Sequence, residues 1–163
     1  MLAFLCGGME FAPKEGREWR KVLGNWIYRN LNHQIYDPTQ EAKIILSAEE
    51  LDGLDRWKQS DPVRFRALMR RIINHDLDVM AHQTDYVICY WDQAAARGGG
   101  TQAELTAAFR KSLPIYLVSE LPVPEISGWV LGCADYVIPG FEKLKKCLKT
   151  TYSPTEKSST LNL

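Results

Sequence analysis

The chain has 163 residues, 45% of them hydrophobic and 25% charged, which is the composition of one globular domain of ordinary size. Twenty Lys and Arg balance twenty Asp and Glu, so the formal net charge is zero. This balance argues against a nucleic-acid polymer or an anionic membrane surface as a partner. No apolar run approaches the roughly 20 residues that a membrane-spanning helix needs.

The first half of the chain is expected to contain two strands and three helices. Short apolar runs beside Gly or Pro predict the strands, and apolar residues spaced three and four apart predict the helices. Ser47 and Glu50 have the spacing of a capping box, which indicates a helix start. The expected elements are a strand over 2–6, a helix over 16–32, a strand over 34–39, a helix over 47–59 and a helix that begins at Pro62.

The second half is expected to add three strands and two helices. Residues 86–91 are continuously apolar, as in a central strand that is covered on both faces. The other expected elements are a helix over 101–111, a strand over 114–118, a strand over 136–138 and a final helix marked by Phe141, Leu144 and Leu148. Because residues 151–163 are polar, we expect a domain over 1–150 and a disordered tail after it.

Strands that alternate with helices predict β-α-β units and a parallel sheet. Right-handed crossovers place helices on both faces, which gives a three-layer α/β sandwich of the flavodoxin or Rossmann type. Such sheets bind ligands beyond the carboxyl ends of their strands. The informative loops are therefore those that follow predicted strands, over residues 7–16, 37–41, 92–101 and 119–129.

The cysteines and histidines show no metal-ligand spacing. No two of the four cysteines form a CxxC pair, and no histidines form a motif such as HExxH. Most of the cysteines lie in apolar stretches, so we expect reduced structural thiols and a cytoplasmic protein. We therefore expect no metal and no organic cofactor. The residues concerned are Cys6, Cys89, Cys133, Cys147, His33, His75 and His82.

A glycine-rich loop precedes the predicted helix over 101–111. The glycines at 98–100 allow close approach of the backbone to a ligand, and a helix N-terminus favours a negative group. No Lys follows these glycines, which excludes a P-loop, and the loop does not have the pattern GxGxxG. Thr101 and Glu104 also have the spacing of a capping box, which is a purely structural alternative for this acidic residue.

Four segments stand out in the sequence: FLCGGMEFAP, NHDLD, TDYVICYWD and GGGTQAEL. Together they resemble the nucleoside 2-deoxyribosyltransferase family over about residues 3–148. The most specific part is the glycine-rich loop followed by a Glu in the first turn of a helix. The resemblance implies a five-stranded parallel α/β sandwich. It also implies an enzyme that cleaves or exchanges the N-glycosidic bond of a 2′-deoxynucleoside or its monophosphate.

The resemblance assigns the nucleophile to Glu104 and implies a second carboxylate that assists the leaving base. Cleavage of the bond builds positive charge on the sugar, which a carboxylate stabilises and then traps covalently. Asp76 matches the Asn-Asp-Leu pattern of the family best, and Asp78 is the alternative. Either carboxyl group would give its proton to the departing base.

The candidate substrate-binding residues lie near the ends of the predicted strands. Trp91 ends the central strand and Asp92 follows it. Asp92 would recognise the base, and Trp91 or Met9 would stack on it. A turn is the structural alternative for Asp92, and core packing is the alternative for Trp91. The full set is Gly7, Gly8, Met9, Glu10, Trp91, Asp92, Gly99, Gly100, Thr101, Glu125 and Ser127.

Two positions depart from the family pattern. Phe4 stands where relatives often carry a Tyr that contacts the catalytic Glu, and Gly98 stands where they carry an Asp or a Ser. These departures leave the base, the sugar and the phosphate preference open. Because family sites are often completed by a neighbouring subunit, Glu125 and Ser127 imply a homodimer or a higher homo-oligomer.

Two other functions fit the same residues. The first is a non-catalytic module that binds or senses a nucleotide, which Phe4 and Gly98 suggest. The second is an N-glycosidase of a larger or modified nucleotide, such as a dinucleotide. In either case the partner is a small molecule, and the fold alone does not decide between them.

Overall fold

Five parallel strands form the centre of the molecule. The computed structural model describes residues 1–153 and orders the strands β2-β1-β3-β4-β5. This is a doubly wound order, with its reversal between β1 and β3. Every neighbouring pair is parallel, so the expected fold class is confirmed. The strands are β1 (Leu2–Gly7), β2 (Gln34–Tyr36), β3 (Tyr86–Tyr90), β4 (Ile115–Val118) and β5 (Tyr136–Ile138).

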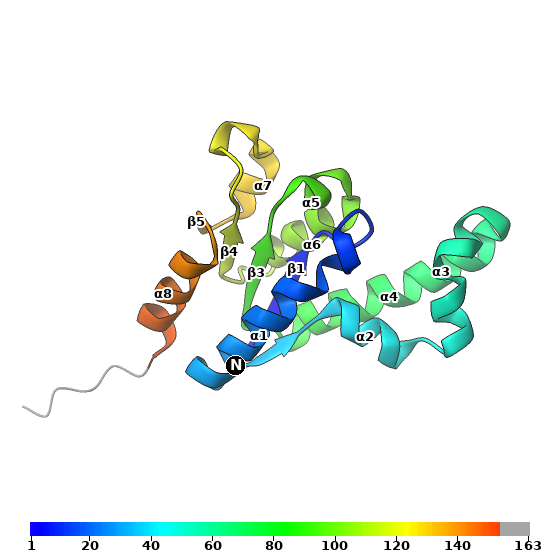
Figure 1. The fold of residues 1–163 in the computed structure, drawn as a ribbon, viewed down its shortest axis with the longest axis horizontal. Helices are drawn as coiled ribbons and strands as arrows, with labels where there is room; N and C mark the ends of the chain where they lie inside the picture. The colour runs from blue at the N-terminus through cyan, green and yellow to red at the C-terminus, as the bar shows by residue number, and fades with distance from the viewer. Residues whose placement is uncertain (154–163) are drawn as a thin grey trace, which may run out of the picture.

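Helices cover both faces of the sheet and complete three layers (Figure 1). Helices α1 and α8 pack on one face, where Leu23 and Leu144 join the core. Helices α4 to α7 pack on the other face, where Leu105 and Val130 join a second core. The helices are α1 (Arg17–Leu31), α2 (Pro38–Ile45), α3 (Ala48–Ser60), α4 (Pro62–His82), α5 (Gln93–Arg97), α6 (Gly99–Arg110), α7 (Gly128–Cys133) and α8 (Phe141–Tyr152).

Helix α3 and the first half of α4 extend away from the sheet as an arm (Figure 1). The expected capping box is present at the start of α3, where Ser47 and Glu50 each accept a hydrogen bond from the other's backbone N–H. On the arm, Lys58 forms an ion pair with Glu10 of the loop after β1. This pair ties the arm to that loop. The small core of the arm is built from Leu46, Trp57 and Leu68.

Two helices begin where the sequence predicted a strand end or a loop. Pro38, predicted to end a strand, is instead the first residue of α2. The carboxylate of Asp37 caps that helix by accepting a hydrogen bond from the backbone N–H of Thr39 at 2.9 Å. Asp92 likewise caps α5 by accepting from the N–H of Ala95 at 2.8 Å. An aspartate cap and a first-position proline both favour a helix, so these short segments become helical.

Three further boundaries differ from the expected ones. Helix α6 begins at Gly99 rather than at Thr101, and α7 begins inside the predicted loop over 119–129. Helix α8 continues through Tyr152, past the expected domain end at residue 150. Residues 154–163 of the expected tail lie outside the described residues. Within residues 1–153, no helix combines the length and the apolar character needed to cross a membrane.

Candidate active site

Glu104 lies on α6, about one turn after the glycine-rich loop. Gly98 stands at the N-cap of this helix, and no side chain caps it. Thr101 is the third helical residue and is buried, so it does not occupy a capping position. The capping-box alternative for Thr101 and Glu104 is therefore wrong. Glu104 instead points toward β1, where its carboxylate meets a cysteine.

That cysteine is Cys6, a fully buried residue of β1. Its Sγ donates to Oε2 of Glu104 across 3.0 Å. Burial raises the pKa of Cys6 well above its ordinary value, with its strand neighbour Cys89 contributing, so the sulfur stays a protonated donor at neutral pH. The sequence predicted only a structural thiol here. Cys6 does pack in the core, and it also orients the candidate nucleophile.

Asp76 is a buried carboxylate whose charge acts on the half-buried Glu104. It lies on α4 with 8% of its surface exposed, and Oδ1 accepts a hydrogen bond from the Tyr36 hydroxyl at 2.5 Å. Burial raises the pKa of Asp76, while the Tyr36 hydrogen bond and His75 act in the opposite direction. The negative charge of Asp76 in turn raises the pKa of Glu104, so the two carboxyl groups are electrostatically coupled.

Asp78 lies on a different side of α4. Two residues turn a helix by about 200°, so Asp76 and Asp78 point in nearly opposite directions. Asp78 is exposed, and its backbone carbonyl accepts a hydrogen bond from Nδ1 of His82 at 2.9 Å. Of the two aspartates predicted to assist the leaving base, Asp76 is the buried one, and its charge raises the pKa of Glu104.

The environment of Glu104 raises the pKa of its carboxyl group to about 7. Burial is the largest cause, and the charge of Asp76 adds to it. Two groups act in the opposite direction, the Cys6 thiol through its hydrogen bond and the guanidinium of Arg20 through its charge. A carboxyl group with such a pKa is present in both its protonated and its ionised form near neutral pH. The ionised form can act as a nucleophile, and the protonated form can give up a proton.

Arg20 is a buried cation that sequence reasoning missed. Its side chain is fully buried, and its Nε lies 3.7 Å from Oδ1 of Asp37. Because α1 presents Leu23 and Ile27 to the core, an arginine three and seven residues before them was an available signal. Its guanidinium fixes the end of β1 and the loop that follows. The groups that accept its hydrogen bonds are the carbonyls of Leu5, Gly7, Glu15 and Gly16.

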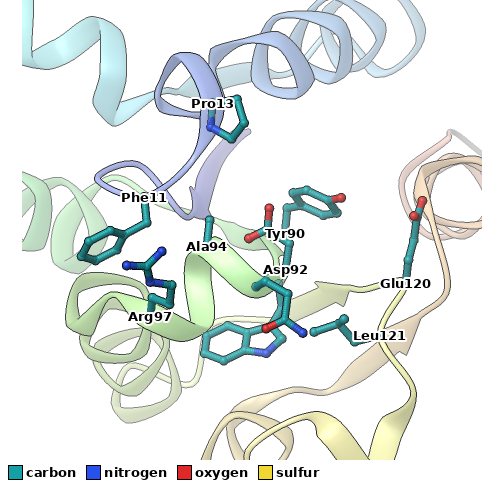
Figure 2. Close-up of a pocket in the computed structure, with 10 residues that line it drawn as sticks. Phe11, Pro13, Tyr90, Asp92, Ala94, Arg97, Glu120 and Leu121 are labelled. Atoms are coloured by element: carbon teal, nitrogen blue, oxygen red, sulfur yellow. The ribbon is translucent and has the colours of Figure 1, made fainter.

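A pocket of about 410 Å³ opens beyond the carboxyl ends of β3 and β4. Figure 2 shows Phe11 and Arg97 on one side of it and Tyr90, Glu120 and Leu121 on the other. The Arg97 guanidinium lies 4.4 Å from the centre of the Phe11 ring, a cation–π contact. Neither Glu104 nor Asp76 lines this pocket.

Trp91 and Asp92 both line this pocket, and each also has a structural role. Trp91 is 1% exposed and belongs to the core, while its indole Nε1 has no hydrogen-bond partner among the described residues. Asp92 uses Oδ1 to cap α5. Their predicted contacts with a substrate stay predictions.

The other predicted binding residues are divided between closed and open surroundings. Gly8 is buried so tightly that a Cβ there would lie 2.7 Å from the backbone nitrogen of Ala95 on α5. Gly7 and Thr101 are also buried, whereas Gly99 and Gly100 face open space. The remaining candidates are at least partly exposed, and they are Met9, Glu10, Glu125 and Ser127. Within residues 1–153, no group of three or more His, Cys, Asp and Glu side chains is arranged to hold a metal ion.

Comparison with known proteins shows that the fold is similar to those of two enzymes. No protein-family model and no curated protein matches the sequence. Among solved structures, a 2-deoxyribosyltransferase from Bacillus psychrosaccharolyticus is similar with a TM-score of 0.63 and 13% identity, over 89% of this chain and 90% of that chain. The CMP N-glycosidase of Clostridium botulinum is similar with a TM-score of 0.52 and 12% identity, over 93% of this chain and 99% of that chain. The chain therefore has the nucleoside 2-deoxyribosyltransferase fold that its motifs resemble.

Proposed function

We propose that this protein cleaves or exchanges the N-glycosidic bond of a 2′-deoxynucleoside or its monophosphate, with Glu104 as nucleophile and Asp76 as acid. The observation that carries the proposal is the coupled pair of carboxyl groups, in which Cys6 holds one and Tyr36 holds the other. The fold shared with a 2-deoxyribosyltransferase and a CMP N-glycosidase supports this class of chemistry. The expected partner is a small nucleoside or nucleotide.

In the first step, an Oε atom of Glu104 attacks C1′ of the sugar. The C1′–N bond breaks, and the base leaves with the bonding electron pair while Asp76 gives its proton to the base. In the second step, water or an acceptor base attacks C1′, Glu104 leaves as a carboxylate, and Asp76 takes the proton of the attacking group. The same carboxyl group thus acts first as acid and then as base.

The pH dependence follows from the number of protons that the pair holds. The reactive form has one proton on the pair, since Glu104 must be ionised while Asp76 is protonated. The last proton leaves with a pKa of about 7, so we expect kcat/KM to fall as pH rises above about 7. It also falls at lower pH, where the pair gains its second proton. A pH–rate profile on one deoxynucleoside checks this bell shape, and a plateau that continues above pH 8 would contradict it.

Replacing Asp76 with Asn is expected to remove the acid and lower kcat by about 10²- to 10⁴-fold. The loss should shrink for a substrate whose base leaves without protonation, such as a nitrophenyl deoxyriboside. Asp78→Asn is the matched control, because Asp78 is exposed on the far side of the same helix. Steady-state rates on both substrates give the comparison. Equal losses on the two substrates would argue against Asp76 as the acid.

Chromatography of reaction mixtures tests the proposed function itself. Purified protein is incubated with deoxynucleosides, their monophosphates and a dinucleotide, with and without an acceptor base. Release of free base, or formation of a new nucleoside, is expected from the wild type and not from Glu104→Ala. Dependence on the acceptor separates a transferase from a hydrolase. No product from any substrate, together with retained ligand binding, would favour a sensing module, and cleavage of the dinucleotide alone would favour an N-glycosidase of larger substrates.

A further inference from the structure

One hydroxyl group donates a hydrogen bond to the Asp76 carboxylate. Among residues 1–153, the Tyr36 side chain is the single hydrogen-bond donor to it, and it donates to Oδ1 at 2.5 Å. Oδ2 receives no hydrogen bond from these residues. Tyr36 and Asp76 are 5% and 8% exposed, so bulk water has little access to either group. The hydroxyl therefore distinguishes the two oxygens of this carboxyl group.

The ring of Tyr36 is held in place by its neighbour on the next strand. Tyr36 is the last residue of β2 and lies in register with Phe4 of β1. The two rings stack with centroids 4.8 Å apart and planes 21° from parallel. A stacked, buried ring has few alternative orientations, so its hydroxyl stays directed at Asp76.

The charged and titratable groups around Asp76 come from four elements. Tyr36 lies on β2, Glu41 on α2, His75 on α4 and Glu104 on α6, and each interacts electrostatically with Asp76. Nε2 of His75 lies 3.8 Å from Oε2 of Glu41. When His75 is protonated, its positive charge lowers the pKa of Asp76, whereas the negative charge of Glu41 raises it. Burial and the Asp76 hydrogen bond keep Tyr36 protonated by raising the pKa of its hydroxyl, and Tyr36 therefore remains a donor.

We propose that Tyr36 is the positioning residue of the acid, and that its hydroxyl occupies Oδ1 so that Oδ2 alone transfers a proton to the leaving base. The proposal rests on the proposed function and specifies how its acid is oriented. Tyr36 keeps its own proton throughout, because the proton that reaches the base comes from Oδ2 of Asp76. A carboxyl group held in one orientation transfers its proton along one path.

Tyr36→Phe tests this role because it removes the hydroxyl and keeps the stacked ring. A hydrogen bond donated to a carboxylate stabilises the charged form, so its loss raises the pKa of Asp76. We expect kcat to fall about 10-fold with little change in KM, and the alkaline limb of the pH–rate profile to move to higher pH. The ¹³C carboxyl titration of Asp76, followed by NMR without substrate, should move in the same direction.

Two comparisons separate this role from simple packing. Tyr86→Phe removes another buried tyrosine hydroxyl, one that lies 3.1 Å from Nδ1 of His33, and should leave both titrations unchanged. Placing 3-fluorotyrosine at position 36 makes the hydroxyl a stronger donor, so both titrations should move to lower pH. Opposite shifts in the two position-36 variants would support the proposal. Unchanged titrations in both, with an active wild type, would overturn it alone, whereas a wild type that releases no base would overturn the proposed function and this inference with it.

Discussion

Glu104→Gln is expected to lower the rate of base release by roughly 10³-fold or more, because the amide cannot form the bond to C1′. The substitution keeps the shape of the side chain. Ligand binding, measured by calorimetry with a deoxynucleoside monophosphate, should persist in the variant. Glu142→Gln is a matched control that should keep wild-type rates, because Glu142 is exposed on α8, on the opposite face of the sheet from Glu104. Base release by Glu104→Gln at more than a tenth of the wild-type rate would contradict a nucleophilic role.

Thermal unfolding distinguishes this loss of chemistry from a loss of structure. Because the folded state raises the pKa of Glu104 from 4.5 to about 7, it binds more protons than the unfolded chain between these values. Wild-type stability therefore falls as pH rises through this window, and the uncharged variant escapes that loss. Glu104→Gln should unfold at a higher temperature than the wild type at pH 8 and at a similar temperature near pH 4.

Arg20→Met is expected to have the largest effect on stability, a loss of about 3–5 kcal/mol. The variant would leave the Asp37 carboxylate buried without its cation. It would also deprive four backbone carbonyls of a hydrogen-bond donor. Unmet buried polar groups cost more than the lost bonds contribute. Urea denaturation gives the free energy of unfolding directly.

Lys21→Met is the matched control for this effect, because Lys21 is the exposed neighbour of Arg20 on α1. Its free energy of unfolding should stay within about 0.5 kcal/mol of the wild type. If Arg20→Met cost no more than this control, Arg20 would not be holding the loop that follows β1. The interpretation that the buried Arg20 stabilises this loop through its hydrogen bonds would then be wrong.

The sheet could be predicted from the sequence because its strands are short apolar runs with little local ambiguity. The run over 86–91 is buried on both faces as a central strand, and the periodic apolar spacing over 16–32 forms α1. The short helices α2 and α5 were harder to predict. Each depends on one aspartate cap. The Asp-Pro pair at the start of α2 is also typical of the end of a strand.

The candidate site was predictable where its residues belong to motifs, and not where it depends on distant contacts. Glu104 follows the glycine-rich loop, and Asp76 lies in the Asn-His-Asp-Leu-Asp stretch, so both could be named. Cys6 and Tyr36 could not, because they meet these carboxylates across 98 and 40 positions of the chain. Such contacts follow from strand order and register, which local patterns do not encode.

The central claim is that Glu104 forms a covalent bond to C1′ of the sugar, and mass spectrometry tests it most directly. The protein is quenched in acid while it turns over a 2′-fluoro-2′-deoxynucleoside, in which fluorine slows breakdown of the intermediate. We predict a mass gain of one fluorodeoxyribosyl group on the peptide that contains Glu104, and none in Glu104→Gln. Base release with an unmodified Glu104 peptide, or with the sugar attached to another residue, would contradict the claim.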